Sequence, residues 1–520
     1  MKFKHLIWFE LVYLGLFILL FPGFRYNIDP DATGYLSVAE HCANGDYFKS
    51  INGIWSPLSS WLVAPLIKAG FDGVLAVKYL NGLYGLLSLG AFFFLIKRYA
   101  IEKRVALALL LTAVILILYF VYYRLFGDLL QLFLLLTYLN LITGEAFTKR
   151  YLKIFLAALI GGVCFYAKAV SFYFILLHLP LVILVLEKNK EQGIFRIVAL
   201  KKIVLSGIVL MVMVAPWALA IKSKYGNLAL SNNSLTGLYS LANPEKRVLF
   251  YRPPYEDGYS VWDDLSTWNV STVKPYSNKD VAVFLVKVIF SNFKILISTL
   301  NNFSLFFNAI LLATFVLFIK KRHFFFGNNN VLIILSTIII WCAMFLVLHV
   351  EARFMWIIAL LGLLLLGILL SVLTEKSLIR GKLFFAITLI TVMSFWVYPI
   401  DELKAQYRIG VNVYKMAEAF KQQKISGNII SRNYDGSDMV NTVILNYWIK
   451  GKYYGPVLFD FSTDEIFDAI EKYRIDYYIL YFKNGYQKDE ILTSLAAKKA
   501  SAIFENVYPN VIVLSFKKGN

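Results

Sequence analysis

Two carboxylates stand just beyond the first apolar run of the sequence. Asp29 and Asp31 follow residues 6–21, a run long enough to begin a membrane-spanning helix. Carboxylates this close to lipid are costly unless they face water or a binding partner. We therefore predict that the pair faces a substrate at the membrane edge. Taken alone, Asp-Pro-Asp before a helical pattern is equally an ordinary helix N-cap or a solvated turn.

Three basic residues lie in short loops on the same predicted side as the aspartates. Arg124, Lys168 and Arg353 are exceptions to the rule that outer loops are poor in Lys and Arg. A cation at the outer membrane boundary suits a lipid phosphate, with Lys as a point charge and Arg as a bidentate fork. The alternative for each residue is a side chain that snorkels from a helix end. Because three exceptions converge on the aspartate-bearing side, we favour phosphate binding.

Further polar residues accompany these cations. Asp128 either joins the candidate site or caps the fourth span, and His349 and Glu351 either join it or merely pair with Arg353. We expect no metal site and no disulfide framework, because the histidines are scattered and the cysteines form no metal-ligand spacing. The cysteines are Cys42, Cys164 and Cys342.

The elements that position these residues are expected to be membrane helices. Of the 520 residues, 59% are hydrophobic and 16% are charged, a balance that soluble domains of this length do not carry. The net charge of +19 could point to nucleic acid, but the basic residues gather in short hydrophilic gaps, as cytoplasmic loops do. Apolar runs predict about eleven spans, near 6–22, 76–96, 105–122, 129–143, 154–170, 172–186, 203–221, 303–319, 331–348, 354–373 and 383–399.

The basic gaps alternate onto one side of the predicted membrane, which identifies that side as cytoplasmic. We expect the N-terminus there, as an uncleaved first span, because no small-residue cleavage site follows the apolar run. An odd number of spans places the residues after Tyr398 outside. The basic residues are Lys2 and Lys4; Lys97, Arg98, Lys103 and Arg104; Lys149, Arg150 and Lys153; Lys188, Lys190, Arg196, Lys201 and Lys202; Lys320, Lys321 and Arg322; Lys376, Arg380 and Lys382.

The outer side is expected to hold three long pieces. The first loop, 23–75, contains the aspartates and a surface helix over Tyr35–Phe48, and the second, 222–302, ends in a stretch, Val281–Leu300, that we place in the interface. The C-terminal tail predicts a small α/β domain, so we divide the chain into a membrane domain, 1–400, and a soluble domain, 401–520. Its expected elements are strands at Asn428–Ser431, Ile475–Phe482 and Val511–Phe516, and a helix from the capping box Ser462–Glu465 to about Tyr473.

Several motifs, taken in order, resemble those of the GT-C glycosyltransferases of the protein O-mannosyltransferase and aminoarabinose-transferase type (family 39). The resemblance covers roughly residues 1–370. Two departures are that Ala32 follows Asp31 where the family often has Glu, and that Lys168 lacks the usual flanking Thr and Gly. The matching segments are Asp31, Tyr35, Ala39 and Gly45-Asp46; Ser56-Pro57-Leu58 with Trp61-Leu62; Gly127-Asp128; Gly161-Gly162 through Lys168; Ala215-Pro216-Trp217 with Tyr225-Gly226-Asn227; and Glu351-x-Arg353-Phe354.

The resemblance implies a GT-C membrane fold and a polyprenyl-phosphate-linked sugar as donor. It implies a single inverting displacement in which Asp31, at the family's spacing from Tyr35, is the general base, with Asp29 as its less certain substitute. The cations would stabilise the leaving phosphate, and the neighbouring acidic residues would orient the cations or hold sugar hydroxyls. A divalent ion at Asp29 is compatible with distant GT-C enzymes, but no ligand cluster supports one. The expected substrate-binding residues are Lys168, Arg353, Arg124, Asp128, Glu351, His349 and Tyr35.

Two other functions compete with this interpretation. A transporter or flippase for lipid-linked saccharides also needs cations and a lipid groove, but transporters tend to show internal repeats and polar midplane spans. A scaffolding membrane protein with a binding tail is the third class. Because the polar residues concentrate on one side, we favour an enzyme of a bacterial cell membrane, with a glycan, lipid or protein as acceptor and no nucleic acid as partner. The sequence identifies neither the sugar nor the acceptor.

Overall fold

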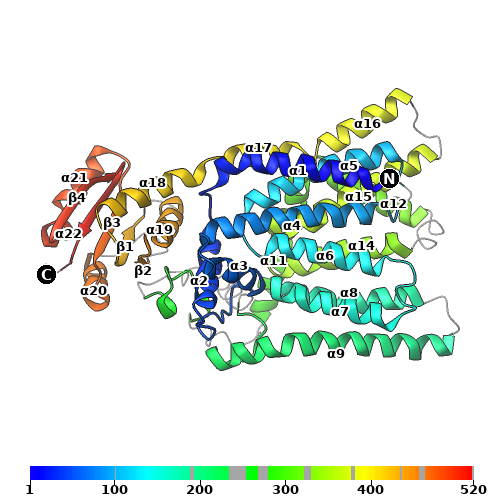
Figure 1. Cartoon of the computed structure of the whole chain (residues 1–520), viewed down its shortest axis with the longest axis horizontal. Coiled ribbons are helices and arrows are strands. Elements are labelled where there is room, and N and C mark those ends of the chain that lie inside the picture. Colours follow the sequence, from blue (N-terminus) through cyan, green and yellow to red (C-terminus); the bar gives the residue numbers. More distant parts are fainter. Residues whose placement is uncertain are drawn as a thin grey trace. The chain divides into compact units, whose positions relative to one another are not determined.

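The computed structural model describes most of the chain, which is mainly helical (Figure 1). The described residues are 1–99, 101–187, 192–232, 253–267, 279–320, 329–375, 381–433, 436–455 and 463–517. Some predicted features lie outside these ranges, namely the basic loop residues Lys188, Lys190, Lys321, Arg322, Lys376 and Arg380, and Ser462 of the predicted capping box.

The chain folds into two compact units, and each is described by itself. Unit 1 consists of Met1–Pro22, Val77–Leu230 and Lys274–Tyr407, and unit 2 consists of Gly23–Ala76, Ser231–Val273 and Arg408–Asn520. Unit 2 therefore combines parts of the first and second predicted outer loops with the C-terminal part of the chain. The division into a membrane domain and a soluble domain at residue 400 stays a prediction.

Unit 1 is a bundle of apolar helices. Eight helices among the described residues are long and apolar enough to cross a membrane, and a bent helix pair counts as a ninth span. The helices that contribute to the bundle are α1 (Phe3–Phe24), α4 (Gly73–Ile96), α5 (Lys103–Tyr123), α6 (Asp128–Ile142), α7 (Tyr151–Ala167), α8 (Val170–Glu187), α9 (Gln192–Tyr225), α11 (Lys279–Phe303), α12 (Phe307–Lys320), α14 (Asn329–Val347), α15 (Trp356–Glu375), α16 (Gly381–Met393) and α17 (Val397–Gln406).

Each of the eleven predicted spans overlaps one of these helices, and the last, 383–399, runs from α16 into the start of α17. The spans near 129–143 and 154–170 correspond to α6 and α7, which are apolar but have only 15 and 17 residues. A helix rises about 1.5 Å per residue, so these two are short for a full hydrocarbon core. The chain is a multi-pass membrane protein of mainly α structure, as predicted.

The interior of unit 1 is built around α5 and α15. Each is 78% buried along its most apolar window, and the Phe120 ring stacks on Trp356 with 4.5 Å between ring centroids. Close packing also explains two adjacent glycines in α7. A Cβ at Gly161 would lie 2.7 Å from Ile175 of α8, and a Cβ at Gly162 would lie 2.7 Å from Met213 of α9. Larger side chains there would push the three helices apart.

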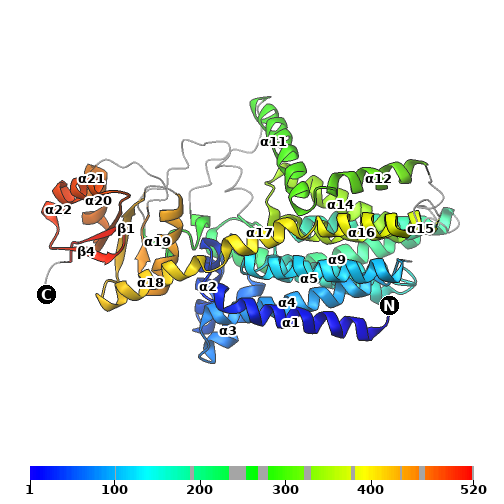
Figure 2. The ribbon, with the colours of Figure 1, turned by 90° about the horizontal axis from the view of Figure 1, so that it is seen from above.

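The helix junctions of unit 1 alternate between the two ends of the bundle (Figure 1). The α5/α6, α7/α8 and α14/α15 junctions, which carry the predicted outer cations, lie at one end, and the N-terminus lies at the other. The helix α11 turns sharply into α12, with a bend of 102° at residues 304–306. Figure 2 shows α11 turned away from the direction of α12, a geometry that suits the interfacial position predicted for Val281–Leu300.

Unit 2 contains a five-stranded mixed sheet in the order β2-β1-β3-β5-β4. The strands β2, β1 and β3 are parallel, and β5 runs antiparallel to both β3 and β4. The predicted strands Asn428–Ser431, Ile475–Phe482 and Val511–Phe516 correspond to β1, β3 and β5. The strands are β1 (Asn428–Arg432), β2 (Lys452–Tyr453), β3 (Tyr477–Tyr481), β4 (Ala502–Tyr508) and β5 (Val511–Ser515).

Helices cover the sheet of unit 2. One face carries an apolar cluster in which Ile430, Leu480 and Ile512 of the sheet pack against α20, α21 and α22. On β3, Tyr481 exchanges a hydrogen bond of 2.8 Å with Thr442 of α19. The helical elements of unit 2 are α2 (Pro30–Ala43), α3 (Leu58–Lys68), η2 (Tyr255–Asp257), η3 (Leu265–Thr267), α18 (Ile409–Gln422), α19 (Gly436–Ile449), α20 (Thr463–Tyr473), α21 (Gly485–Thr493) and α22 (Leu495–Lys499).

The surface helix predicted over Tyr35–Phe48 is shifted. The helix α2 begins at Pro30 and ends at Ala43, followed by Asn44 and by Gly45 in the left-handed region at φ 85°. It begins early because Asp29 caps it and Pro30 supplies a helical φ at the first position, where no N–H is needed. The first predicted aspartate therefore lies at the helix start, and the second lies inside the first turn.

Candidate functional site

One end of unit 1 holds a buried ion pair between Asp128 and Lys168. The Lys168 Nζ lies 3.2 Å from Asp128 Oδ1, and the two side chains are 17% and 3% exposed. Asp128 opens α6, whereas Lys168 ends α7 in an extended conformation with φ −153° and ψ 122°. Since α8 begins only two residues later, the lysine lies in a sharp junction that fixes its direction. A buried pair of this kind depends on both partners, because removal of one leaves an uncompensated charge.

The backbone that leads into α6 is strained. Phe126 and Gly127 both have positive φ, at 67° and 52°. Glycine adopts this region readily, whereas a bulky residue such as phenylalanine seldom does. Strain of this kind persists where surrounding contacts impose it, and it is frequent at functional sites. Here the two left-handed residues set the direction in which Asp128 enters the bundle end.

A second ionic cluster at this end comes from the α14/α15 junction. Arg353 Nε lies 2.7 Å from Glu351 Oε2, and His349 Nε2 lies 3.5 Å from Glu351 Oε1. Burial alone would raise the pKa of Glu351, but the hydrogen bond from His349 and the charge of Arg353 outweigh it and lower the pKa to about 2. The Arg353 guanidinium also lies over the Phe354 ring, at 5.1 Å from its centroid. The arginine is therefore held on two sides.

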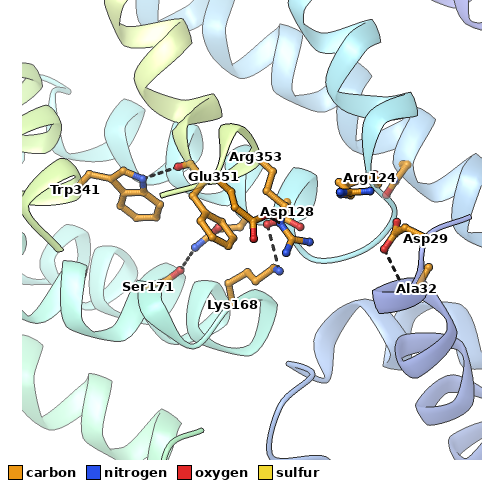
Figure 3. A network of polar contacts seen from close by, with 12 residues as sticks. Asp29, Ala32, Arg124, Asp128, Lys168, Ser171, Trp341, Glu351 and Arg353 are labelled. Atoms are coloured by element: carbon orange, nitrogen blue, oxygen red, sulfur yellow. Dashed lines mark hydrogen bonds and ion pairs between the residues drawn. The ribbon is translucent and has the colours of Figure 1, made fainter. Parts of the chain in front are cut away.

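The two clusters face a common region. Figure 3 shows the side chains of Asp128, Lys168, Glu351 and Arg353 pointing toward one another from three helix junctions. The Arg124 guanidinium lies over the Tyr123 ring at 4.9 Å, and the Tyr123 hydroxyl is within electrostatic reach of Arg124, Glu351 and Arg353. Unit 1 thus brings together all six of its predicted site residues, including His349.

Two residues near this end were not predicted. Tyr123 ends α5, and its only sequence signal is its position directly before Arg124. Gln131 donates a hydrogen bond of 2.7 Å to Ser171, three residues after Lys168, and so joins the first turns of α6 and α8. A buried glutamine inside an apolar run was the signal for it, because such a group needs a hydrogen-bond partner.

The remaining predicted residues lie in unit 2. Asp29 is the N-cap of α2, and its Oδ1 accepts a hydrogen bond of 3.2 Å from the Ala32 N–H. Asp31 lies in the first turn of the helix and accepts a hydrogen bond of 3.2 Å from the indole N–H of Trp262. Tyr35 is only 2% exposed and packs against Trp55, with 5.2 Å between ring centroids. Its ring therefore belongs to the packed interior of unit 2.

A buried carboxylate next to Trp262 escaped the sequence analysis. Asp263 is 3% exposed and accepts hydrogen bonds from the Ser260 hydroxyl (2.9 Å), the Thr33 hydroxyl (3.3 Å) and the Tyr259 backbone N–H (2.7 Å). Burial raises the pKa of this carboxyl to about 6, although the hydrogen bonds partly oppose the rise. No local spacing marks Asp263 or Trp262 as site residues, because the contacts that join them to α2, with Thr33 and Asp31, come from a distant part of the sequence.

Glycine at position 34 allows the first helix turn to pack closely. A Cβ at Gly34 would collide with the indole of Trp55. The Trp55 indole N–H donates a hydrogen bond of 2.9 Å to the Asp263 carbonyl. The close approach of Trp55 to α2 thus places the Asp263 segment against the helix that carries Asp31.

No group of three or more His, Cys, Asp and Glu side chains in the described parts of the chain is arranged to hold a metal ion. The expectation that the protein needs no metal is not tested by this finding. A surface pocket of about 450 Å³ is lined by residues after α4, at the end of α6 and at the start of α7, whereas Asp128 and Lys168 lie at the opposite ends of α6 and α7. Its cations Arg98 and Lys153 donate to backbone carbonyls, of Asn140 (3.0 Å) and Glu145 (2.6 Å), so they serve the α6/α7 turn.

Solved structures resemble this chain over nearly its whole length. ArnT from Cupriavidus metallidurans bound to undecaprenyl phosphate matches with a TM-score of 0.56 at 12% identity, over 98% of this chain and 97% of that one. The apo state of the same protein matches with a TM-score of 0.52 at 13% identity, over 97% of each chain. The oligosaccharyltransferase of Archaeoglobus fulgidus in complex with zinc and sulfate matches with a TM-score of 0.51 at 13% identity, over 96% of this chain and 71% of that one.

These similarities identify the fold. The chain has the GT-C fold of polytopic membrane glycosyltransferases, as the sequence motifs predicted. No protein-family model matches the chain, and no curated protein matches it at the level of sequence. At 12–13% identity the likeness concerns the fold, so the activity and the roles of single residues are matters for proposal.

Proposed function

We propose that the protein is an integral membrane glycosyltransferase that moves a sugar from a polyprenyl-phosphate-linked donor to an acceptor hydroxyl. What supports the proposal is the GT-C fold combined with the cations that gather at one end of unit 1. The similar ArnT is described with bound undecaprenyl phosphate, a lipid phosphate of the proposed class. The acceptor would be a glycan, a lipid or a protein.

The proposed reaction is a single displacement with inversion. Asp31 takes the proton of the acceptor hydroxyl, whose oxygen attacks the anomeric carbon of the sugar. The bond between that carbon and the phosphate oxygen breaks, and its electron pair leaves with the polyprenyl phosphate. A positioned general base contributes on the order of 10²–10⁴-fold to such a reaction. The assignment of Asp31 rests on its spacing to Tyr35 and on the family resemblance.

Lys168 and Arg353, with Arg124, would stabilise the charge that grows on the leaving phosphate. Each of the first two already has a carboxylate partner, at 3.2 Å and 2.7 Å, so it is held in place before a substrate arrives. Preorganised charges of this kind are usually the largest contribution to catalysis. Asp128 and Glu351 would orient the cations, and His349 would contribute through Glu351.

We also propose the orientation of the protein. The N-terminus and the basic helix junctions would face the cytoplasm of a bacterial cell, and the end of unit 1 with the candidate site would face outward. Unit 2 would then lie outside the cytoplasm. The reaction would occur at the outer surface of the membrane, where lipid-linked sugars meet extracytoplasmic acceptors.

The decisive experiment measures release of polyprenyl phosphate by the purified protein from a panel of lipid-linked sugars. We expect release with one donor, and a loss of at least roughly 100-fold in Lys168→Ala, Arg353→Ala and Asp31→Asn. Matched controls are Lys103→Ala, an exposed lysine at the other end of the bundle, and Asp468→Asn, an exposed aspartate of α20. Full activity in all three site variants would contradict the mechanism.

The same preparation tests the competing transporter. If the protein is a transporter, vesicles reconstituted with it would show movement of lipid-linked saccharide between the leaflets without release of polyprenyl phosphate. That result would replace the glycosyltransferase proposal by the flippase alternative.

A further inference from the structure

The hydrogen bond between Trp262 and Asp31 joins two segments that are 231 positions apart in the sequence. The indole Nε1 donates to Asp31 Oδ1 at 3.2 Å, and both side chains are partly buried. We propose, on the basis of the proposed function, that Trp262 is a positioning residue for Asp31. Its N–H holds one carboxylate oxygen and thereby sets the direction in which the other oxygen faces the acceptor hydroxyl.

The turn that carries Trp262 is fixed by its own hydrogen bonds. The Trp262 backbone N–H donates to the Ser260 hydroxyl at 3.1 Å, and that hydroxyl donates to Asp263 Oδ1 at 2.9 Å. Asp263 Oδ2 accepts from the Tyr259 N–H at 2.7 Å, which closes the turn from the other side. The polar groups of a buried network must be satisfied together, so this turn has little freedom to rotate the indole.

The same turn is bound to the helix that carries Asp31. Thr33, two residues after Asp31, donates to Asp263 Oδ1 at 3.3 Å. The Asp263 carbonyl accepts from Asn52 Nδ2 and from the Trp55 indole N–H, both at 2.9 Å. A closed loop of contacts therefore runs from Asp31 to Trp262, through Asp263 and Thr33, and back to α2. Such a loop fixes both partners of the Trp262–Asp31 hydrogen bond.

The C-terminal part of unit 2 also holds the turn that carries Trp262. The Tyr453 N–H of β2 donates to the Tyr259 carbonyl at 2.9 Å, and the Val261 N–H donates back to the Tyr453 carbonyl at 3.2 Å. Lys452, beside it on β2, forms an ion pair of 2.8 Å with Asp257. Residues 259–261 therefore extend the edge of the sheet. This gives the C-terminal sheet a role in the proposed reaction, because it holds the turn that orients the base.

The charged residues around this turn tie the same three segments together. Lys450 forms an ion pair of 2.9 Å with Glu40 of α2 and donates to the Tyr259 hydroxyl at 2.9 Å. Tyr259 also donates a hydrogen bond to Glu40. Trp262 itself packs with Val261 and Met439, the latter from α19. The Trp262 indole therefore makes apolar contacts with these two residues, and its N–H donates to Asp31.

The test removes the indole N–H in two ways. Trp262→Phe removes the N–H together with the indole shape, whereas replacement of Trp262 by benzothienylalanine keeps the shape and has sulfur in place of the N–H. Both should lower kcat roughly 10-fold or more, the usual effect of a hydrogen bond to a charged group. The acid limb of the pH–rate profile should move to higher pH, because the charged form of the base loses a donor. The donor KM should stay unchanged.

The matched control is Trp396→Phe, which removes an indole N–H that donates to the Thr112 hydroxyl at 2.9 Å within unit 1. This variant should lower the thermal midpoint and leave the acid limb in place. Wild-type kcat and pH profile in the benzothienyl protein would overturn the inference, as would an equal shift of the acid limb in Trp396→Phe. If the wild-type protein releases no polyprenyl phosphate from any donor, the proposed function itself fails, and the two failures are thereby distinguished.

Discussion

The two units treat their carboxylates in opposite ways. In unit 1, Asp128 and Glu351 each face a cation, Lys168 at 3.2 Å and Arg353 at 2.7 Å. In unit 2, Asp31 faces the neutral N–H of Trp262. A cation orients a carboxylate by the attraction between opposite charges, whereas a neutral N–H orients one oxygen through a directional hydrogen bond. The difference suits carboxylates that hold cations in place in unit 1 and a carboxylate with one positioned oxygen in unit 2.

The partly buried Glu351 and the buried Asp263 make the contrast between the units measurable. The pKa of Glu351 is lowered to about 2, because His349 and Arg353 outweigh the cost of its burial. The pKa of Asp263 is raised to about 6, because burial outweighs the hydrogen bonds from Ser260, Tyr259 and Thr33. Burial acts in the same direction on both groups, so the charge of the partner decides the sign.

The largest effect should follow from breaking the ion pair of unit 1. Lys168→Met leaves the Asp128 carboxylate buried without its cation, which should cost about 3 kcal/mol of stability. Transfer should fall by at least roughly 100-fold, because a preorganised charge is lost. Adding Asp128→Asn removes the uncompensated charge and should restore most of the thermal stability without restoring transfer. Thermal unfolding in detergent and the polyprenyl phosphate release assay measure the two effects.

The double variant separates two roles of Lys168. If Lys168→Met/Asp128→Asn regains transfer, the lysine serves only to neutralise Asp128. The Asp128–Lys168 pair would then no longer support the contrast between the two units. Lys103→Met, at the other end of the bundle, controls for the loss of one positive charge and should change neither measurement.

The sequence predicted the membrane elements well, because the thickness of a bilayer fixes the length of an apolar run. The cations were found from the sidedness of the loops, and Asp-Pro-Asp at the start of α2 followed from capping chemistry. Trp262 and Asp263 could not be found in this way. Their importance comes from contacts with α2 across more than 200 residues, and tertiary contacts between loops leave no local spacing.

Some local features were also beyond the sequence. The strand β2 has only two residues, too few for an alternating pattern, yet it supports the turn that carries Trp262. The positive φ of Phe126 is imposed by its surroundings, and nothing in the residue type indicates it. The helix predicted over Tyr35–Phe48 followed the amphipathic pattern, and its start was not taken from the capping alternative for Asp-Pro-Asp; the Asp29 cap moves the helix start to Pro30.

The second prediction uses pH to test the contrast between the units. A lowered pKa stabilises the folded state above the ordinary value of 4.5, so Glu351→Gln should be less stable than wild type at pH 7. This difference should shrink as the pH falls through about 4.5 toward about 2. A raised pKa has the opposite effect on the free energy of unfolding, because the charged form then destabilises the folded state. The cost of the buried Asp263 charge is present above about pH 6 and disappears as the pH falls toward 3.8.

Asp263→Asn should therefore gain stability relative to wild type between pH 4 and pH 7, by about 3 kcal/mol for a shift of about two pKa units. Thermal midpoints of wild type and both variants, measured from pH 3 to pH 8, give the two differences. Asp468→Asn, on an exposed aspartate, is the control for loss of a carboxylate. Two differences that change with the same sign would show that the charge of the partner does not govern these carboxyls.

The smallest effect should separate the two aspartates with which the candidate site began. Asp29→Ala removes the N-cap of α2 and should cost about 1 kcal/mol, whereas Asp29→Ser keeps a capping oxygen and should cost much less. Because the Asp29 carboxylate is assigned to capping and Asp31 to proton transfer, both Asp29 variants should keep most of the transfer activity that Asp31→Asn loses. If Asp29→Ser loses transfer as severely as Asp31→Asn while its thermal midpoint is unchanged, Asp29 takes part in the chemistry, and the pair acts as one acidic unit.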